Sequence, residues 1–465
     1  MDYLKNVGTR QTPPTEHVPG RTDQVKNSAG GVVFEVDAWA KLDRFLLMGS
    51  EGGTYYVGQR ELTLQNVSCA IGLIASDGVR VVERVVEISD AGRAPSNDPA
   101  LFVLALASAG PSTEVRQAAL DALPKVARIG THLFHFMTFV RQFRGRGRSL
   151  NRALRSWYED RDVDSLALQA VKFKQRDGWS HRDVMRLCKP KTDDPVRNAV
   201  FAYMVGKAGV EELATAPRII EASVRAQAGT LSPGEIRELR LPREALRTED
   251  LNNPAVWEEL LYDMPIGALV RNLGRLTASG FIKPFTVQES VVVQKLLDER
   301  AIKKSRIHPI AILLALRTYA SGGGALGKLT WHPCGAIVEA LNDAFKMAFE
   351  NVAPTGKRTL IGLDVSGSMG SPVNGAKILT CREASAAMAS ILIATEEHTH
   401  TVGFVSSDAS RNRWGGGAPA LQVLPFTRRS SIEDIVNHVQ GLRFGGTDIS
   451  LPMLYALDQG IGVDA

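Results

Sequence analysis

The strongest chemical signal in this sequence is the stretch LIGLDVSGSM at residues 360–369. Directly after an apolar run, it places a carboxylate and two hydroxyls at alternate positions, on Asp364, Ser366 and Ser368. Such hard oxygen donors are the ligands that Mg²⁺ or Mn²⁺ prefers. The apolar run predicts a buried β-strand. We therefore predict a metal site on the loop that follows; for the motif taken by itself, an Asx-type turn without metal is the alternative.

A second signal is the positive charge concentrated in residues 141–191. They include fourteen lysines and arginines against six acidic residues, a net charge of +8, whereas the whole chain carries +5 and the remainder therefore −3. Such an excess favours a polyanionic partner, most often a nucleic acid. Its first part, RQFRGRGRSLNRALR, has no acidic residue, and arginine forks can grip phosphate with paired hydrogen bonds. An ordinary solvated basic face is the alternative. The arginines are Arg141, Arg144, Arg146, Arg148, Arg152 and Arg155.

The second part of this basic region contains Lys172 and Arg176, four residues apart. That spacing predicts that both project from one face of a helix, which we expect to end near Gly178. More basic residues follow and extend the surface. They are Arg182, Arg186, Lys189 and Lys191.

A new helix is predicted to begin at Ser180. The hydroxyl of Ser180 and the carboxylate of Asp183, three residues later, form the pattern of a capping box. Trp179 and His181 lie at the junction of the two predicted helices, where a stacking or base-edge contact with a nucleic acid is one interpretation. Packing in the core is the favoured interpretation for Trp179.

The elements that must position these residues are of two kinds. Residues 27–350 show helical periodicity again and again, with glycines at the helix ends, and we predict stacked helix pairs of the solenoid type. Residues 351–357 contain a Pro-Thr-Gly junction typical of a domain boundary. After it, strands and helices alternate, which predicts an open α/β sheet.

Composition limits the class of protein. A chain of 465 residues suggests roughly two to four domains, and no apolar run approaches the roughly 20 residues that cross a bilayer. Residues 1–26 are polar and rich in proline and threonine, so we predict a flexible tail rather than a secretory signal. Four scattered cysteines without CxxC spacing favour reduced thiols and neither a zinc site nor a disulfide framework. We predict a soluble cytoplasmic protein.

Several long blocks resemble one family. KFKQRDGWSHRDVMRL, MPIGALVRNLGRLTASG, KKSRIHPIAILLALRTYASG and PTGKRTLIGLDVSGSM are similar to the TROVE module and following domain of the Ro60 family, whose bacterial members are called Rsr. The resemblance implies a mainly α fold in which HEAT-like helical repeats close into a ring over residues 27–352. A truncated α/β open-sheet von Willebrand factor A domain would follow over residues 357–465.

The family's function gives the basic residues expected roles. In the family, Y RNA docks on the outer surface, and single-stranded ends of misfolded or immature RNA thread a basic central hole. The resemblance matches Lys172 and Arg176 to the residues that hold Y RNA, and it places Lys189 where the vertebrate-type pattern has a histidine. It also implies a monomer and, in bacterial relatives, an exoribonuclease tethered through the RNA. Candidate RNA-binding residues are therefore Lys172, Arg176, His181, Lys189 and Arg144, with Arg141, Arg271, Arg275 and His308 proposed for the hole.

The resemblance also gives the DVSGS loop a role, because the motif DxSxS is typical of the metal-ion-dependent adhesion site of von Willebrand factor A domains. It implies that Asp364, Ser366 and Ser368 form the first group of Mg²⁺ ligands and that Thr447, from FGGTDIS, adds a hydroxyl from a second loop. The family's third ligand group would lie beyond Ala465. We therefore expect a weakened metal site and a sheet that lacks strands.

These observations favour an RNA-binding scaffold without catalytic activity. No nucleophile–base pair, nuclease carboxylate cluster or phosphate-binding GxxxxGK[ST] loop stands out in the sequence. The alternative is a metal-dependent protein-adhesion module, in which the metal binds an acidic partner and the helices present it. A metal-dependent hydrolase is less favoured, because hydroxyl ligands suit binding better than the activation of water.

Overall fold

A computed structural model describes most of the chain. The described residues are 15–17, 19–26, 30–49, 59–92, 94, 96–324, 328–373, 376–405, 420–430, 432–440 and 447–465. They fall into two compact units, Thr12–Asp263 and Met264–Ala465. No helix within these ranges is both long and apolar enough to cross a membrane. All four cysteines are free thiols, as the sequence predicts.

The predicted N-terminal tail lies largely outside the described residues. Its last part is not a tail, however, because β1 (Gln24–Lys26) pairs antiparallel with β2 (Val32–Phe34). The prediction of a tail that extends to residue 26 is therefore wrong at its end. Two short β-prone runs, QVK and VVF, carry this hairpin.

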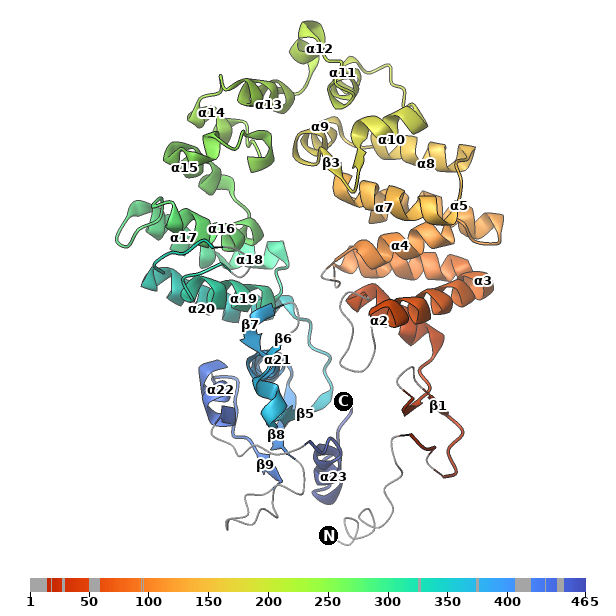
Figure 1. Cartoon of the computed structure of the whole chain (residues 1–465), viewed down its shortest axis with the longest axis vertical. Helices are drawn as coiled ribbons and strands as arrows, with labels where there is room; N and C mark the ends of the chain where they lie inside the picture. Colours follow the sequence, from red (N-terminus) through yellow and green to blue (C-terminus); the bar gives the residue numbers. More distant parts are fainter. Residues whose placement is uncertain are drawn as a thin grey trace. The chain divides into compact units, whose positions relative to one another are not determined.

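The unit Thr12–Asp263 is mainly helical, as the periodicity predicts (Figure 1). α4 packs against both α3 and α7, and its predominantly buried residues explain its nearly continuous apolar sequence. Helix ends follow local signals: α2 begins where the Asp37 carboxylate accepts from Trp39 N, and it ends at Gly49, whose φ is 66°. The helices are α2 (Ala38–Met48), α3 (Gln59–Ala91), α4 (Asp98–Ala107), α5 (Thr113–Asp121), α6 (Leu123–Val126), α7 (Gly130–Phe143), α8 (Arg148–Glu159), α9 (Val163–Lys172), α10 (His181–Cys188), α11 (Pro195–Met204), α12 (Val210–Thr215), α13 (Arg218–Ala228), α14 (Pro233–Glu238) and α15 (Pro254–Asp263), with 3₁₀ turns η1 (Arg243–Ala245) and η2 (Asp250–Asn252).

The predicted helix through Lys172 and Arg176 is wrong. α9 ends at Lys172, and Arg176 belongs to a small hairpin in which β3 (Gln175–Arg176) pairs antiparallel with β4 (Trp179–Ser180). The turn residues Asp177 and Gly178 have φ values of 52° and 76°. An Asp-Gly pair with both φ values positive is the preferred two-residue connection of a β-hairpin, and it ends the helical pattern here.

The unit Met264–Ala465 combines helices with a small open sheet, and the sheet begins at Arg358, where the sequence predicts α/β structure. β5 runs parallel to β8, with Arg358 opposite His398 and Asp364 opposite Phe404, and β9 pairs antiparallel with β8. The elements are α16 (Ile266–Ala278), α17 (Val287–Leu296), α18 (Glu299–Ser305), α19 (Pro309–Ala320), α20 (Gly335–Met347), η3 (Ala348–Asn351), β5 (Arg358–Asp364), η4 (Gly367–Gly370), β6 (Pro372–Val373), β7 (Ala376–Thr380), α21 (Cys381–Thr395), β8 (His398–Phe404), β9 (Leu421–Val423), α22 (Ile432–Gln440) and α23 (Leu451–Asp458).

α19 contacts β7 and α21 of the sheet region. The Arg317 guanidinium on α19 lies 3.2 Å from a carboxylate oxygen of Glu433 on α22 and 3.7 Å from one of Glu383 on α21. At the end of the described chain, Leu360 N of β5 donates to Ala465 O at 2.9 Å, and Asp464 N donates to Arg358 O at 2.8 Å. These last residues therefore run beside β5, at the edge away from β8.

Candidate functional site

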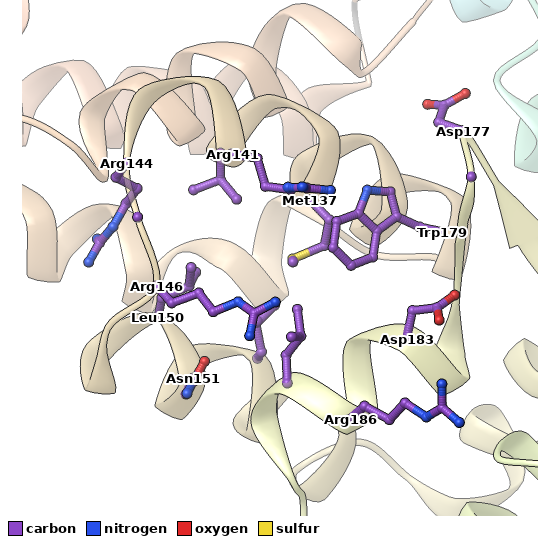
Figure 2. A pocket seen from close by; sticks show the side chains of 15 residues that line it. Met137, Arg141, Arg144, Arg146, Leu150, Asn151, Asp177, Trp179, Asp183 and Arg186 are labelled. Atoms are coloured by element: carbon purple, nitrogen blue, oxygen red, sulfur yellow. The ribbon is translucent and has the colours of Figure 1, made fainter.

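The basic region of the unit Thr12–Asp263 surrounds a pocket of about 710 Å³ (Figure 2). α7, the loop after it, α8, the β3–β4 hairpin and α10 all contribute to its walls. The side chains and glycines that line it are Met137, Val140, Arg141, Arg144, Gly145, Arg146, Leu150, Asn151, Leu154, Asp177, Gly178, Trp179, Asp183, Arg186 and Leu187. The pocket thus joins both parts of the basic sequence stretch.

Trp179 forms part of the pocket wall. The sequence favoured a core position for it, but the side chain is only half-buried and lies beside the pocket. The guanidinium carbon of Arg141 lies 5.4 Å from the centre of the indole ring, within the range of a cation–π contact. Arg141 is itself exposed at the end of α7. An aromatic surface and a cation are therefore held together at the edge of the pocket.

The hairpin that presents Trp179 packs against α7, and a histidine of that helix lies beside its turn. His135 Nδ1 lies 2.9 Å from Asp98 Oδ1, and its Nε2 lies 3.7 Å from Asp177 Oδ2 in the hairpin turn. The Arg176 side chain is 60% exposed, and among the described residues its one ion pair is a long contact of 3.7 Å with Asp177. Because that contact is long and exposed, Arg176 is available to a solvent-side anion.

Lys172 and Lys189 lie at the ends of helices. Lys172 is the last residue of α9, half-buried, with its ammonium nitrogen 5.4 Å from the centre of the Phe173 ring. Lys189 is exposed and ends α10 in the left-handed conformation, with φ of 51°. The capping box predicted at the other end of α10, between Ser180 and Asp183, is confirmed.

His181 is not a surface residue. Its side chain is 3% exposed, Nδ1 lies 3.1 Å from the Tyr158 hydroxyl, and its ring meets the Phe134 ring edge-on at 4.9 Å between centres. Burial lowers the pKa of His181 to about 4, so the imidazole is neutral at physiological pH. The prediction that His181 contacts RNA is therefore not supported, because the ring lies within the core.

The arginine run divides into two classes. The Arg144 guanidinium donates to the Ser108 carbonyl at 2.7 Å, and burial and then the nearby Arg116 lower its pKa, so Arg144 is committed to the fold. Arg152 likewise donates to Gln117 Oε1 at 2.9 Å. Arg146, in contrast, is exposed and makes no hydrogen bond or ion pair with any described residue. Arg146 is therefore an unpaired cation at the pocket among the described residues. The sequence alone did not show that Arg146 differs in this way from the neighbouring arginines.

The remaining residues proposed for a central hole belong to the unit Met264–Ala465, whereas Arg141 belongs to the other unit. Arg271 is exposed on α16, and its Nε donates to the Gly267 carbonyl at 2.7 Å. Arg275 is half-buried on the same helix. His308 caps α19 by accepting from Ile310 N at 3.2 Å, and burial lowers its pKa. The hole itself stays a prediction.

The predicted metal ligands come together at the carboxyl end of β5. Thr447 Oγ1 donates to Asp364 Oδ2 at 3.3 Å, and the hydroxyls of Ser366 and Ser368 lie 3.0 Å apart. Ser366 N also donates to Asp364 Oδ1 at 2.8 Å, so an Asx-type contact coexists with the cluster. In the described ranges no three His, Cys, Asp or Glu side chains form a metal-binding group. The donor set is thus one carboxylate with hydroxyls, which suits a hard cation such as Mg²⁺.

The fold and these sites define a class: an α-helical repeat protein with a basic pocket, joined to an open α/β sheet with a hydroxyl-rich loop. Two family models match the chain, the TROVE domain over residues 25–216 and 237–318 and the Ro60 vWA domain over residues 358–465. The chain belongs to the Ro60 family of TROVE-domain proteins.

Individual relatives agree with this assignment. The chain is 39% identical to the RNA-binding protein RO60 of Deinococcus radiodurans over 471 residues, which cover all of this chain and 85% of the relative. It is 31% identical to the RNA-binding protein RO60 of Caenorhabditis elegans over 521 residues, which cover 95% of this chain and 78% of the relative. The crystal structure of the Deinococcus radiodurans RO (RSR) protein superposes with a TM-score of 0.77 at 38% identity, covering 92% of this chain and 85% of that one.

Proposed function

We propose that this chain is a non-catalytic scaffold for small noncoding RNA. The observation that carries the proposal is the cationic surface of α7–α10, where the exposed Arg141, Arg146 and Arg186, which form no ion pair with any described residue, line a pocket. Two relatives named as RNA-binding proteins support it. A Y-like RNA would bind Lys172, Arg176 and Lys189, while single-stranded ends of misfolded or immature RNA would enter a basic hole.

This activity would place a monomeric, cytoplasmic protein in RNA quality control or processing, with an exoribonuclease tethered through the bound RNA. The test is to purify the tagged chain from cells at moderate salt and sequence the RNA that accompanies it. A chain with Lys172→Ala and Arg176→Ala is the matched comparison. The proposal requires enrichment of a small structured RNA with the unchanged chain and less with the variant; no enrichment with either would refute it.

The oxygen cluster at β5 supports a second function, metal-dependent binding of a protein partner. Asp364, Ser366, Ser368 and Thr447 would hold a Mg²⁺ ion, which would supply a Lewis-acidic position for an acidic side chain of the partner. With one carboxylate among these ligands, the charge of the ion would stay largely uncompensated and would attract a carboxylate. Both functions can coexist, because Lys172, Arg176 and Lys189 belong to the other unit.

We expect Asp364→Ala to abolish the heat of Mg²⁺ binding in titration calorimetry, because it removes the anionic donor of the cluster. Asp343→Ala, which removes an exposed carboxylate on α20 of the same unit, is the matched control and should leave the heat unchanged. Equal heats for the unchanged chain and Asp364→Ala would refute the metal site. If Asp364→Ala does abolish the heat, magnesium-dependent capture of an acidic peptide by the unchanged chain would support the second function.

A further inference from the structure

The pocket beside Trp179 combines an apolar floor with a cationic rim. Met137, Val140 and Leu154 are each no more than 2% exposed at its floor, whereas Arg146 and Arg186 are exposed at its rim. Four arginines and two aspartates line it, a net charge of +2. A ligand for this pocket should therefore carry a flat or apolar part together with an anionic part.

We propose that this pocket holds one unstacked nucleotide of a bound RNA, with its base against the indole of Trp179 and its phosphate on Arg146. The inference rests on the proposed RNA-binding function and specifies which part of the RNA, a single nucleotide, this pocket would recognise. At about 710 Å³ the pocket lies in the roughly 300–1,000 Å³ range of small-ligand sites. Proteins commonly recognise RNA through bases that have left the stack, and aromatic side chains receive them.

The base position follows from how Trp179 is held. The two-residue turn of the hairpin and the packing of both its strands against α7 hold the strand that presents the indole. Arg141 lies against the ring, which leaves the rest of the half-buried indole to the pocket (Figure 2). A base stacked there would gain both aromatic contact and the attraction of the Arg141 cation.

The phosphate position follows from Arg146. In Figure 2 its side chain extends from the α7–α8 loop into the pocket toward Trp179, whereas the guanidinium of Arg144 points away, toward its bond with the Ser108 carbonyl. Arg146 makes no hydrogen bond or ion pair with the described part of the chain, so its five donors are open to a phosphate.

Asp183 gives the pocket a preference among bases. Its Oδ2 accepts from both the backbone N–H and the hydroxyl of Ser180, while Oδ1 accepts no hydrogen bond from any residue that the structure describes. A carboxylate oxygen can accept from an exocyclic amino group, which cytosine, adenine and guanine carry and uracil lacks. The pocket should therefore bind cytidine 5′-monophosphate more tightly than uridine 5′-monophosphate.

Titration calorimetry on the full chain tests the inference, with these two nucleotides and inorganic phosphate as separate ligands. Trp179→Ala should weaken nucleotide binding by about 5- to 150-fold, the range expected for one lost stacking contact, while Trp179→Phe should retain much of it. Arg146→Gln should weaken it about 10-fold or more, because a charged hydrogen bond is lost. Lys207→Gln, at an exposed cation of the same unit outside the lining, is the control for lost charge and should bind as the unchanged chain does.

Three results would overturn the inference: no nucleotide heat from a chain that still binds small RNA, inorganic phosphate binding as tightly as the nucleotides, or Trp179→Ala and Arg146→Gln matching the unchanged chain. Equal affinities for the two nucleotides would overturn the role of Asp183. Nucleotide binding by a chain that enriches no small RNA would instead refute the proposed function and leave the pocket assignment standing.

Discussion

Replacing both Lys172 and Arg176 by alanine should weaken binding of a small structured RNA by a predictable amount. Both cations reach solvent from different elements, the end of α9 and the hairpin, so each would contact the RNA backbone separately. A hydrogen bond to a charged group contributes about 1.5–3 kcal/mol. Because the Arg176 side chain is 60% exposed, we discount for solvent and expect about 2–4 kcal/mol in total, or about 30- to 700-fold in Kd.

The dependence of Kd on salt gives a second and independent magnitude. Each phosphate contact contributes about 0.7–0.9 to the slope of log K against log salt, so losing two contacts should reduce the slope by about 1.4–1.8. Filter binding at several salt concentrations measures both quantities. Lys125→Ala with Lys207→Ala is the matched control, since it removes two exposed lysines from the same unit and lowers the net charge equally.

The reasoning fails if the double variant binds with unchanged Kd and slope. It also fails if the control pair loses as much affinity, because the effect would then come from net charge and not from these two positions. Melting curves separate a binding effect from unfolding. Loss of the Lys172 charge from the last turn of α9 should itself cost only about 0.3–1 kcal/mol of stability.

Two predictions concern stability. Burial lowers the pKa of His181 to about 4 in the folded chain, whereas a histidine in the unfolded chain has a pKa near 6.5. Between pH 6.5 and pH 4 only the unfolded state therefore binds the extra proton. The free energy of unfolding should fall by at most about 3 kcal/mol as the pH drops through this range. His181→Gln should flatten that part of a pH series of melting temperatures; an unchanged slope would contradict the assignment. Arg317→Ala should lower the free energy of unfolding of the unit Met264–Ala465, measured in urea, by about 1–2 kcal/mol, because it leaves Glu383 without its cation. Glu433→Gln, which changes a half-exposed partner, should lower it by less. A larger loss of stability for Glu433→Gln than for Arg317→Ala would refute this account.

Local signals predicted much of the fold. Helical periodicity with glycines at the helix ends predicted the helical character of residues 27–350, and α2, α4, α16 and α19 show why: their apolar residues are buried, and each helix ends close to a glycine. The failure at Lys172 and Arg176 had a visible cause. The Asp177–Gly178 pair is typical of a β-hairpin with a two-residue turn. The prediction instead followed the i, i+4 spacing of the two cations, which is typical of a helix.

Tertiary packing decided what local signals could not. His181 begins the stripe His181, Val184, Met185 and Cys188, which has helical spacing and is buried, so the sequence did contain a sign that the ring faces the core. Nothing local showed that Tyr158 would pair with it, since that contact spans 23 positions. The separation of Arg144 from Arg146 likewise depends on the Ser108 carbonyl, 36 positions away from Arg144.

The hairpin links the two proposed RNA contacts. Arg176 and Trp179 are directly opposed in the β3–β4 register, and side chains of opposed residues project to the same side of an antiparallel pair. A strand of RNA held by Arg176 would therefore run beside the indole that we propose receives a base. The hairpin packs against α7, whose His135 in turn lies 2.9 Å from Asp98 of α4. The basic surface and the pocket should consequently act as one site, in which backbone contacts set the position of the RNA and the pocket selects a base.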